Sequence, residues 1–116
     1  MKDDKLYLIH ITECIARIES YTAPGRDAFL CSRMAQDAVV RNFEIMGEAA
    51  KRLSPSFRGE HPAVPWRRIA GFRDVLIHDC VGIDFDELWG IVENHLPGLK
   101  SQLEEILANL RSAPEN

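Results

Sequence analysis

The feature that most limits the possible folds is a spacing, because apolar residues recur every three or four positions through long stretches of this sequence. The first stretch runs from about Asp3 or Asp4 to Tyr21, and its apolar stripe consists of Leu8, Ile11, Ile15 and Ile18. This interval places all four on one face of an α-helix, which predicts a helix with a buried stripe. Residues 23–25, Ala-Pro-Gly, should end that helix, since proline and glycine break helices.

A second and longer helix is predicted from about Asp27 to Leu53. Its stripe consists of Leu30, Met34, Ala38, Phe43, Met46, Ala49 and Leu53, and further apolar residues lie beside it. A stripe this wide favours two packing partners, namely the rest of the domain and a second subunit.

The second half of the sequence alternates helix-breaking residues with more apolar stripes. Residues 54–64 contain Pro55, Gly59 and Pro62, and we expect a loop there. Pro65 suits the first turn of a third helix, which should stop before Gly82. A fourth helix should begin at Asp84, because Glu87 three positions later completes a capping box, and Pro97 should kink or divide it.

No stretch shows the alternation typical of a strand, so we predict an all-α fold, an antiparallel bundle of four to five helices. The 116 residues suit one domain over 1–116, and a hydrophobic content of 46% predicts a packed core. The N-terminus is charged, no apolar run could cross a bilayer, and Cys14, Cys31 and Cys80 form no zinc or disulfide pattern. We therefore expect a cytoplasmic protein with no membrane partner and with reduced cysteines.

Charge is unevenly distributed along the chain. The net charge is −4, which argues against a protein that coats nucleic acid non-specifically. Residues 51–73 nevertheless hold six basic residues and one acid, Glu60, so this segment carries +5 and the remainder −9. Such a segment can attract a phosphate backbone at one face, with Arg67 and Arg68 as candidate contacts, or it can be a solvated charge cluster.

Arg73 and His78 form the candidate catalytic pair. An arginine can clamp and neutralise a phosphate, and a histidine can move a proton near neutral pH, which is the pairing that metal-free RNA cleavage needs. In one α-helix these two residues are about 140° apart around the axis and roughly 7.5 Å apart along it. Either the arginine curls toward the imidazole, or two copies of the helix face each other and share a composite site.

Asp74 and position 80 extend this motif. Asp74 lies four residues before His78, on the same helical face, where it can orient the imidazole or simply be a surface acid. Position 80 lies within about 20° of Arg73 around the helix. Trp66 could stack on a nucleobase, although a tryptophan that begins an apolar helix more often belongs to the core.

Five segments of the sequence resemble HepT-like proteins of the HEPN superfamily. They are residues 38–53 (AVVRNFEIMGEAAKRL), residues 62–79 (PAVPWRRIAGFRDVLIHD), and the shorter runs 82–84, 88–89 and 96–99. The resemblance as a whole extends over nearly the whole chain. The resemblance implies a HEPN-like helical bundle that dimerises through its helices, and a toxin of a toxin–antitoxin pair that acts as a metal-independent ribonuclease without a cofactor.

Within that resemblance, Arg73 and His78 match the family's catalytic arginine and histidine. The implied partner is an MntA-like nucleotidyltransferase antitoxin that uses ATP to adenylylate the toxin, and Arg67 and Arg68 could contact either RNA or that antitoxin. The implied reaction leaves a 2′,3′-cyclic phosphate end on the RNA.

The sequence departs from the family motif, Arg-x-x-x-x-His-x-Tyr, at one position. The motif tyrosine is the residue that is adenylylated, and Cys80 stands in its place here. Three readings are open: a variant neutralised by complex formation alone, a paralogue that has lost regulation, or a substitution that makes the toxin easier to produce. The alternatives to a toxin are an inactive nucleotide- or RNA-binding subunit of a nucleotidyltransferase, and a purely structural helical dimer.

Overall fold

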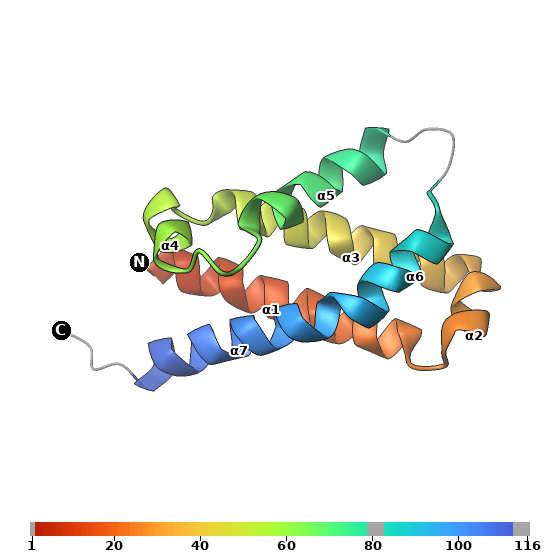
Figure 1. Cartoon of the computed structure of the whole chain (residues 1–116), viewed down its shortest axis with the longest axis horizontal. Helices are drawn as coiled ribbons and strands as arrows, with labels where there is room; N and C mark the ends of the chain where they lie inside the picture. The colour runs from red at the N-terminus through yellow and green to blue at the C-terminus, as the bar shows by residue number, and fades with distance from the viewer. Residues whose placement is uncertain (1, 79–82, 113–116) are drawn as a thin grey trace.

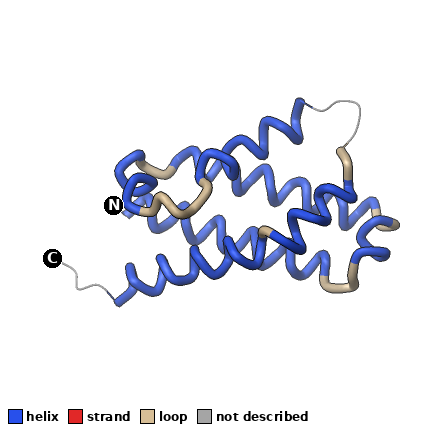
Figure 2. The backbone as a smooth tube through the Cα atoms, in the orientation of Figure 1, coloured by secondary structure: helices blue, strands red, loops and turns tan. Residues whose placement is uncertain are grey.

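The computed structural model describes the backbone of residues 2–78 and 83–112. Side chains are described for residues 3–72 and 83–110. This part of the chain forms seven helices: α1 (Lys2–Thr22), α2 (Arg26–Leu30), α3 (Arg33–Arg52), α4 (Pro55–Glu60), α5 (Trp66–His78), α6 (Phe85–Asn94) and α7 (Leu96–Ser112). No strand occurs among these residues, as Figure 2 shows, so the predicted all-α class is confirmed.

The four long helices form the bundle, and neighbouring long helices run in opposite directions (Figure 1). Helix α1 packs against both α3 and α7, and α5 packs mainly against α3. Helix α6 continues into α7 after a short break and also meets α2 at one end of the bundle. In the described part of the chain, no helix is both long and apolar enough to span a membrane.

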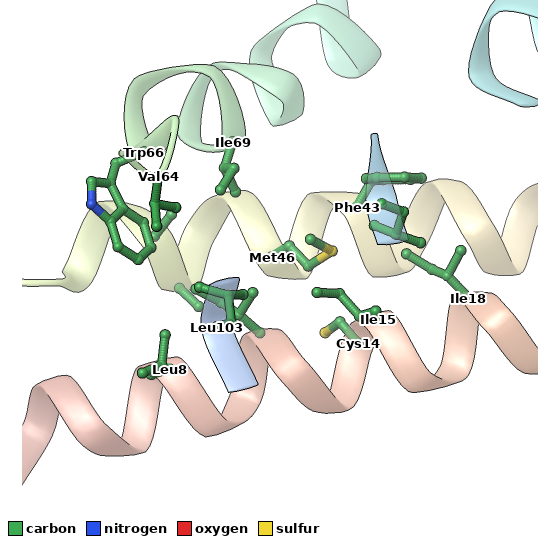
Figure 3. Close-up of a cluster of buried hydrophobic side chains, with 14 of the residues drawn as sticks. Leu8, Cys14, Ile15, Ile18, Phe43, Met46, Val64, Trp66, Ile69 and Leu103 are labelled. Carbon is green, nitrogen blue, oxygen red and sulfur yellow. The ribbon is translucent and has the colours of Figure 1, made fainter. Parts of the chain in front are cut away.

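The apolar stripe of α1 is the centre of the core. Leu8, Ile11, Ile15 and Ile18 are all at most 1% exposed, which confirms their predicted burial. They pack with Phe43 and Met46 of α3 and with Leu103 of α7 in one hydrophobic cluster, part of which Figure 3 shows. Cys14 lies in the same cluster, where burial raises the pKa of its thiol and so keeps it protonated.

The prediction of a single helix from Asp27 to Leu53 was wrong, because the chain breaks at Cys31 and Ser32 between α2 and α3. The Ser32 hydroxyl caps α3 by accepting a hydrogen bond from the Ala35 N–H at 3.1 Å. The Gln36 side-chain amide then donates to the carbonyls of Phe29 and Leu30, at 3.2 and 3.0 Å, and so satisfies the end of α2.

The buried face of α3 differs from the predicted stripe near the start of the helix. Met34, predicted to be in the stripe, is 84% exposed, whereas Val39, absent from the predicted stripe, is completely buried. Met34 and Phe43 are nine residues apart in one continuous helix, which places them about 180° apart around its axis, whereas Val39 lies about 40° from Phe43. The outer face of α3 carries charged side chains, and a second subunit as its packing partner stays a prediction.

The predicted loop at residues 54–64 contains a further helix, α4, so that prediction was wrong for Pro55–Glu60. The Ser54 hydroxyl accepts from the Phe57 N–H at 3.1 Å, and Pro55 occupies the first turn, where a missing N–H costs nothing. Phe57 is buried and fixes α4 to the core. The two short helices α2 and α4 raise the count above the expected four to five.

The predictions for the start and division of the C-terminal helical segment are confirmed. Asp84 caps α6 by accepting from the Glu87 N–H at 3.1 Å. Helix α6 ends at Asn94 and α7 begins at Leu96, so Pro97 lies in the first turn of a new helix and divides the stripe. An ion pair between Arg26 and Asp86 joins α2 to the start of α6.

Asp4 ties the beginning of α1 to the start of α4, and it is the basis of a stability prediction. Its carboxylate is 3% exposed and accepts hydrogen bonds from the Ser54 N–H and the Ser54 hydroxyl, both at 2.7 Å. We expect Asp4→Ala to lower the free energy of unfolding by about 2 kcal/mol, because it removes the acceptor of two partly buried donors, the Ser54 N–H and the Ser54 hydroxyl. Urea unfolding measures this value, with Asp3→Ala as the matched control because Asp3 is exposed. Equal losses in the two variants would contradict the assigned role of Asp4.

Candidate functional site

Helix α5 carries the candidate catalytic residues, and its first two turns are anchored firmly. The Trp66 side chain is 6% exposed, and its indole N–H donates to the His61 carbonyl at 2.9 Å. Further along, Ile69 is buried, and the ring of Phe72 packs on Phe43 of α3 with centroids 4.6 Å apart. These contacts fix the direction of α5 as it approaches Arg73.

The helical backbone of α5 continues without a break through positions 73, 74 and 78. The sequence-based geometry therefore holds for the backbone: positions 73 and 78 are about 140° apart around the axis and about 7.5 Å apart along it. The side chains of Arg73, Asp74 and His78 lie outside the described part of the structure, as does the whole of Cys80. Contact between these groups stays a prediction.

Arg67 and Arg68 are both exposed in the first turns of α5, but they lie in different surroundings. Consecutive helical residues point about 100° apart. As a result Arg68 borders a cavity while Arg67 does not. From the sequence the two arginines have the same candidate role, and the structure places only Arg68 at the cavity.

That cavity, which we call the α5–α7 groove, has a volume of about 630 Å³. Its apolar wall is formed by Phe43, Met46, Ile69, Phe72, Ile91 and Leu99, which come from α3, α5, α6 and α7. Figure 3 shows Phe43, Met46 and Ile69 at the meeting of α3 and α5. Its polar members are Arg68, Asn94, His95 and Gln102. Sequence reasoning missed the groove, because its wall is assembled from four helices that meet only after packing.

The basic segment spans the end of α3, the whole of α4 and the start of α5, which lie at the same end of the bundle in Figure 1. Lys51 and Arg52 are exposed there, as are Arg67 and Arg68. Arg52 pairs with Glu48 at 3.5 Å, so part of this charge is locally balanced. The backbone of the segment thus lies at one end of the bundle and includes the start of the helix that carries the motif.

The two tryptophans are structural. The burial of Trp66 in the core confirms the structural interpretation and excludes base stacking by this residue. Trp89 is half-buried and packs against Phe29 with ring centroids 5.7 Å apart. In the described part of the chain, no three His, Cys, Asp or Glu side chains gather in a group that could hold a metal ion.

Comparison with known proteins shows to which family the chain belongs. The sequence matches the family described as ribonuclease HepT-like over residues 11–106, which is most of the chain and includes the Arg73-to-His78 motif. This protein belongs to the ribonuclease HepT-like family. The HEPN-type resemblance seen in the sequence is thereby confirmed.

Several curated proteins are similar to this HepT-like chain over nearly its whole length. The probable ribonuclease HepT of Thermococcus cleftensis is 41% identical over 106 residues, which cover 90% of this chain and 96% of the relative. A candidate RNase of Caldanaerobacter subterraneus subsp. tengcongensis is 40% identical over 108 residues, covering 92% and 96% respectively.

A longer relative has a different organisation. A Methanocaldococcus jannaschii protein, whose name joins a gamma-glutamylcyclotransferase to a candidate RNase, is 40% identical over 116 residues. The match covers 99% of the HepT-like chain but only 52% of that relative, so the chain spans about half its length. No solved structure gives a significant match to the chain.

Proposed function

We propose that this protein is the toxin of a toxin–antitoxin system and cleaves RNA without a metal ion through Arg73 and His78. Membership of the ribonuclease HepT-like family supports the assignment as an RNA-cleaving enzyme. The main support for metal-independent cleavage through Arg73 and His78 is the Arg-x-x-x-x-His motif on α5, next to the basic segment of residues 51–73.

In the proposed reaction, His78 removes the proton from a ribose 2′-hydroxyl. The 2′-oxygen then attacks the neighbouring phosphorus, and the bond to the 5′-oxygen of the next nucleotide breaks. A proton is returned to that leaving oxygen, so the products are a 2′,3′-cyclic phosphate and a 5′-hydroxyl. Arg73 binds the phosphate and stabilises the charge that develops on its oxygens. Asp74, one turn before His78, serves to hold the imidazole in the productive tautomer.

The proposed enzyme is a homodimer with the motif helices of both subunits at a shared cleft. The support is geometric, since positions 73 and 78 on one α5 backbone face directions about 140° apart. Two copies of α5 across a two-fold axis can bring the arginine of one subunit next to the histidine of the other. Arg67 and Arg68 provide exposed positive charge on the same helix, suited to an RNA strand leading to this cleft.

Regulation in this proposal depends on a nucleotidyltransferase antitoxin, and Cys80 is the point at which this chain differs. The family motif presents a tyrosine for adenylylation, whereas a thiol is not the phenol that such an antitoxin modifies. Neutralisation by tight complex formation is the route that remains open to the chain with Cys80.

Cleavage in a chelator is the direct test of the ribonuclease proposal. We expect purified protein in excess EDTA to cut a labelled single-stranded RNA and to leave 2′,3′-cyclic phosphate ends, which mass spectrometry identifies. The same oligonucleotide with a 2′-deoxyribose at the cut position is the matched control, because it lacks the nucleophile. Equal cutting of the two strands would exclude this mechanism.

A second candidate function is an inactive RNA- or nucleotide-binding subunit of a nucleotidyltransferase. Two observations favour it: the net charge of −4 and the cysteine at the motif tyrosine position. It predicts tight binding of RNA or nucleotide with no cleaved product under any condition, so turnover separates the two functions.

A further inference from the structure

The α5–α7 groove has the size and composition of a small-molecule site. Its volume of about 630 Å³ lies in the range of ligand-binding pockets, roughly 300–1,000 Å³. The walls are mainly apolar, and they include the ring of Phe72, which packs at a tilt on Phe43. A planar, largely apolar group is the kind of ligand that such a wall accommodates.

The polar members of the groove add a site for an anion. Arg68 is exposed, and none of the described carboxylates forms an ion pair with it. Asn94 and His95 are exposed at the break between α6 and α7. Gln102 is held in place because its side-chain amide donates to the Ala63 carbonyl at 3.1 Å. A ligand that is apolar and planar at one end and anionic at the other fits this arrangement.

We propose that the α5–α7 groove binds one nucleotide of the RNA strand, with the base against the apolar wall and a phosphate at Arg68. This inference rests on the proposed ribonuclease function, and it names the part of the surface that receives the substrate. The place of the groove on α5 supports it, because Phe72 lines the groove and directly precedes Arg73.

The spacing along α5 agrees with a strand that crosses both positions. Residues 68 and 73 are about 7.5 Å apart along the helix axis and about 140° apart around it, so a strand that meets both positions must also bend around α5. A stacked strand rises about 3.4 Å per nucleotide, so roughly two nucleotides cover the axial part of that path. The nucleotide in the groove then lies within a few positions of the scissile phosphate bound by Arg73, and the groove contributes to the choice of cleavage site.

A nucleotide is a better occupant than a helix of a second subunit. An α-helix with its side chains is about 10 Å wide, and docking it would require a long open trough. The groove instead is a half-open pocket with an exposed cation and a polar cluster at the α6–α7 break, features that a purely apolar subunit contact does not need.

Two glycines provide a matched test of the groove. Gly98 borders it, and Gly90 in α6 does not. A Cβ added at either glycine meets no atom within 4 Å, so both positions tolerate a side chain without a backbone clash. We expect Gly98→Phe to weaken binding of ribonucleoside 5′-monophosphates at least about ten-fold, which corresponds to the loss of one stacked base. Gly90→Phe should bind as the wild type does. Ligand-observed NMR with AMP, GMP, CMP and UMP measures both.

Arg68→Ala tests the phosphate half of the site without filling the groove. We expect it to weaken the 5′-monophosphates about ten-fold while leaving the uncharged nucleosides nearly unaffected, because only the phosphate requires the guanidinium. Arg33→Ala is the control for net charge, since Arg33 is exposed at the start of α3 and pairs only locally with Asp37. A loss of nucleosides and monophosphates alike in Arg68→Ala would contradict the assigned role.

The outcomes separate this inference from the proposed function. If the wild type cleaves RNA and Gly98→Phe cleaves the same sites at the same rate, the groove is not the nucleotide site. If the wild type is a dimer and Gly98→Phe is a monomer by sedimentation, the groove is a subunit interface and the inference is overturned. Wild-type protein that binds mononucleotides in the groove but never cleaves RNA would support the site and refute the ribonuclease proposal.

Discussion

Arg73→Ala and His78→Ala are each expected to reduce RNA cleavage at least about a hundred-fold, and up to about 10⁴-fold for the histidine. In the proposed mechanism the arginine is the cation that stabilises the charge on the phosphate, and the histidine is the group that moves the proton. Single-turnover cleavage of labelled RNA in EDTA measures both rates. Arg73→Lys should recover only part of the loss, because an ammonium keeps the charge but lacks the planar fork of the guanidinium.

Folding must be excluded as the cause of any such loss. Circular dichroism and urea unfolding of each variant provide that control, and Arg33→Ala provides a matched loss of one positive charge at an exposed position. Cleavage by either alanine variant at the wild-type rate would show that the motif is not catalytic.

Mixing the two inactive variants tests the proposed sharing of the site between subunits. If each cleft combines Arg73 of one chain with His78 of the other, a mixed dimer retains one intact cleft. With random exchange, half of the dimers are mixed, so we expect about a quarter of the wild-type activity to return. Sites contained within one chain would give no recovery, because both clefts of a mixed dimer would then be damaged.

Cys80→Tyr is expected to convert the chain into a substrate for adenylylation. The reason is chemical, since the substitution supplies the phenol of the family motif in place of a thiol. With an MntA-like nucleotidyltransferase and ATP, we expect nearly one AMP per chain in Cys80→Tyr and only background incorporation in the chain with Cys80. Intact-protein mass spectrometry measures the added mass, and once the antitoxin has been removed, RNA cleavage should stay lost only in samples that carry AMP.

Two controls sharpen this experiment. Cys80→Ser removes the thiol without supplying a phenol, and it should remain unmodified. Cys80→Tyr incubated without ATP should regain its activity once the antitoxin is removed, which separates modification from inhibition by binding alone. If the chain with Cys80 is adenylylated as fully as Cys80→Tyr, position 80 is not the site that controls regulation.

The main helices were predictable because their causes are local. The stripe of Leu8, Ile11, Ile15 and Ile18 follows from a spacing of three or four residues within one helix. All four residues are buried. The Asp84 cap and the division at Pro97 also depend on residues a few positions apart. A cap forms by hydrogen bonding within one turn, and proline interrupts a helix because it lacks a backbone N–H. Both effects can be predicted without knowing the rest of the fold.

The break at Ser32 and the short helix α4 were missed because the sequence there is compatible with two local structures. Contacts with other residues decide which of the two forms. Ser32 can continue a helix or cap a new one, and the Gln36 bonds to the end of α2 favour the cap. Ser54 can begin a loop or a helix, and here Asp4, 50 positions earlier, holds it in place. Contacts of this kind exist only after the helices have packed.

The sequence by itself determined the all-α class, the family and the identity of the motif residues Arg73, His78 and Cys80, because these depend on local periodicity and on residue type in order. Tertiary structure decided that Arg68 borders a groove and Arg67 does not, and that Trp66 is buried in the core. It also brought Phe72 of α5 to the same cavity as Ile91 and Leu99. The physical reason is that a helix fixes the direction of each side chain, whereas only the packing of α5 beside α3, α6 and α7 decides what each side chain meets.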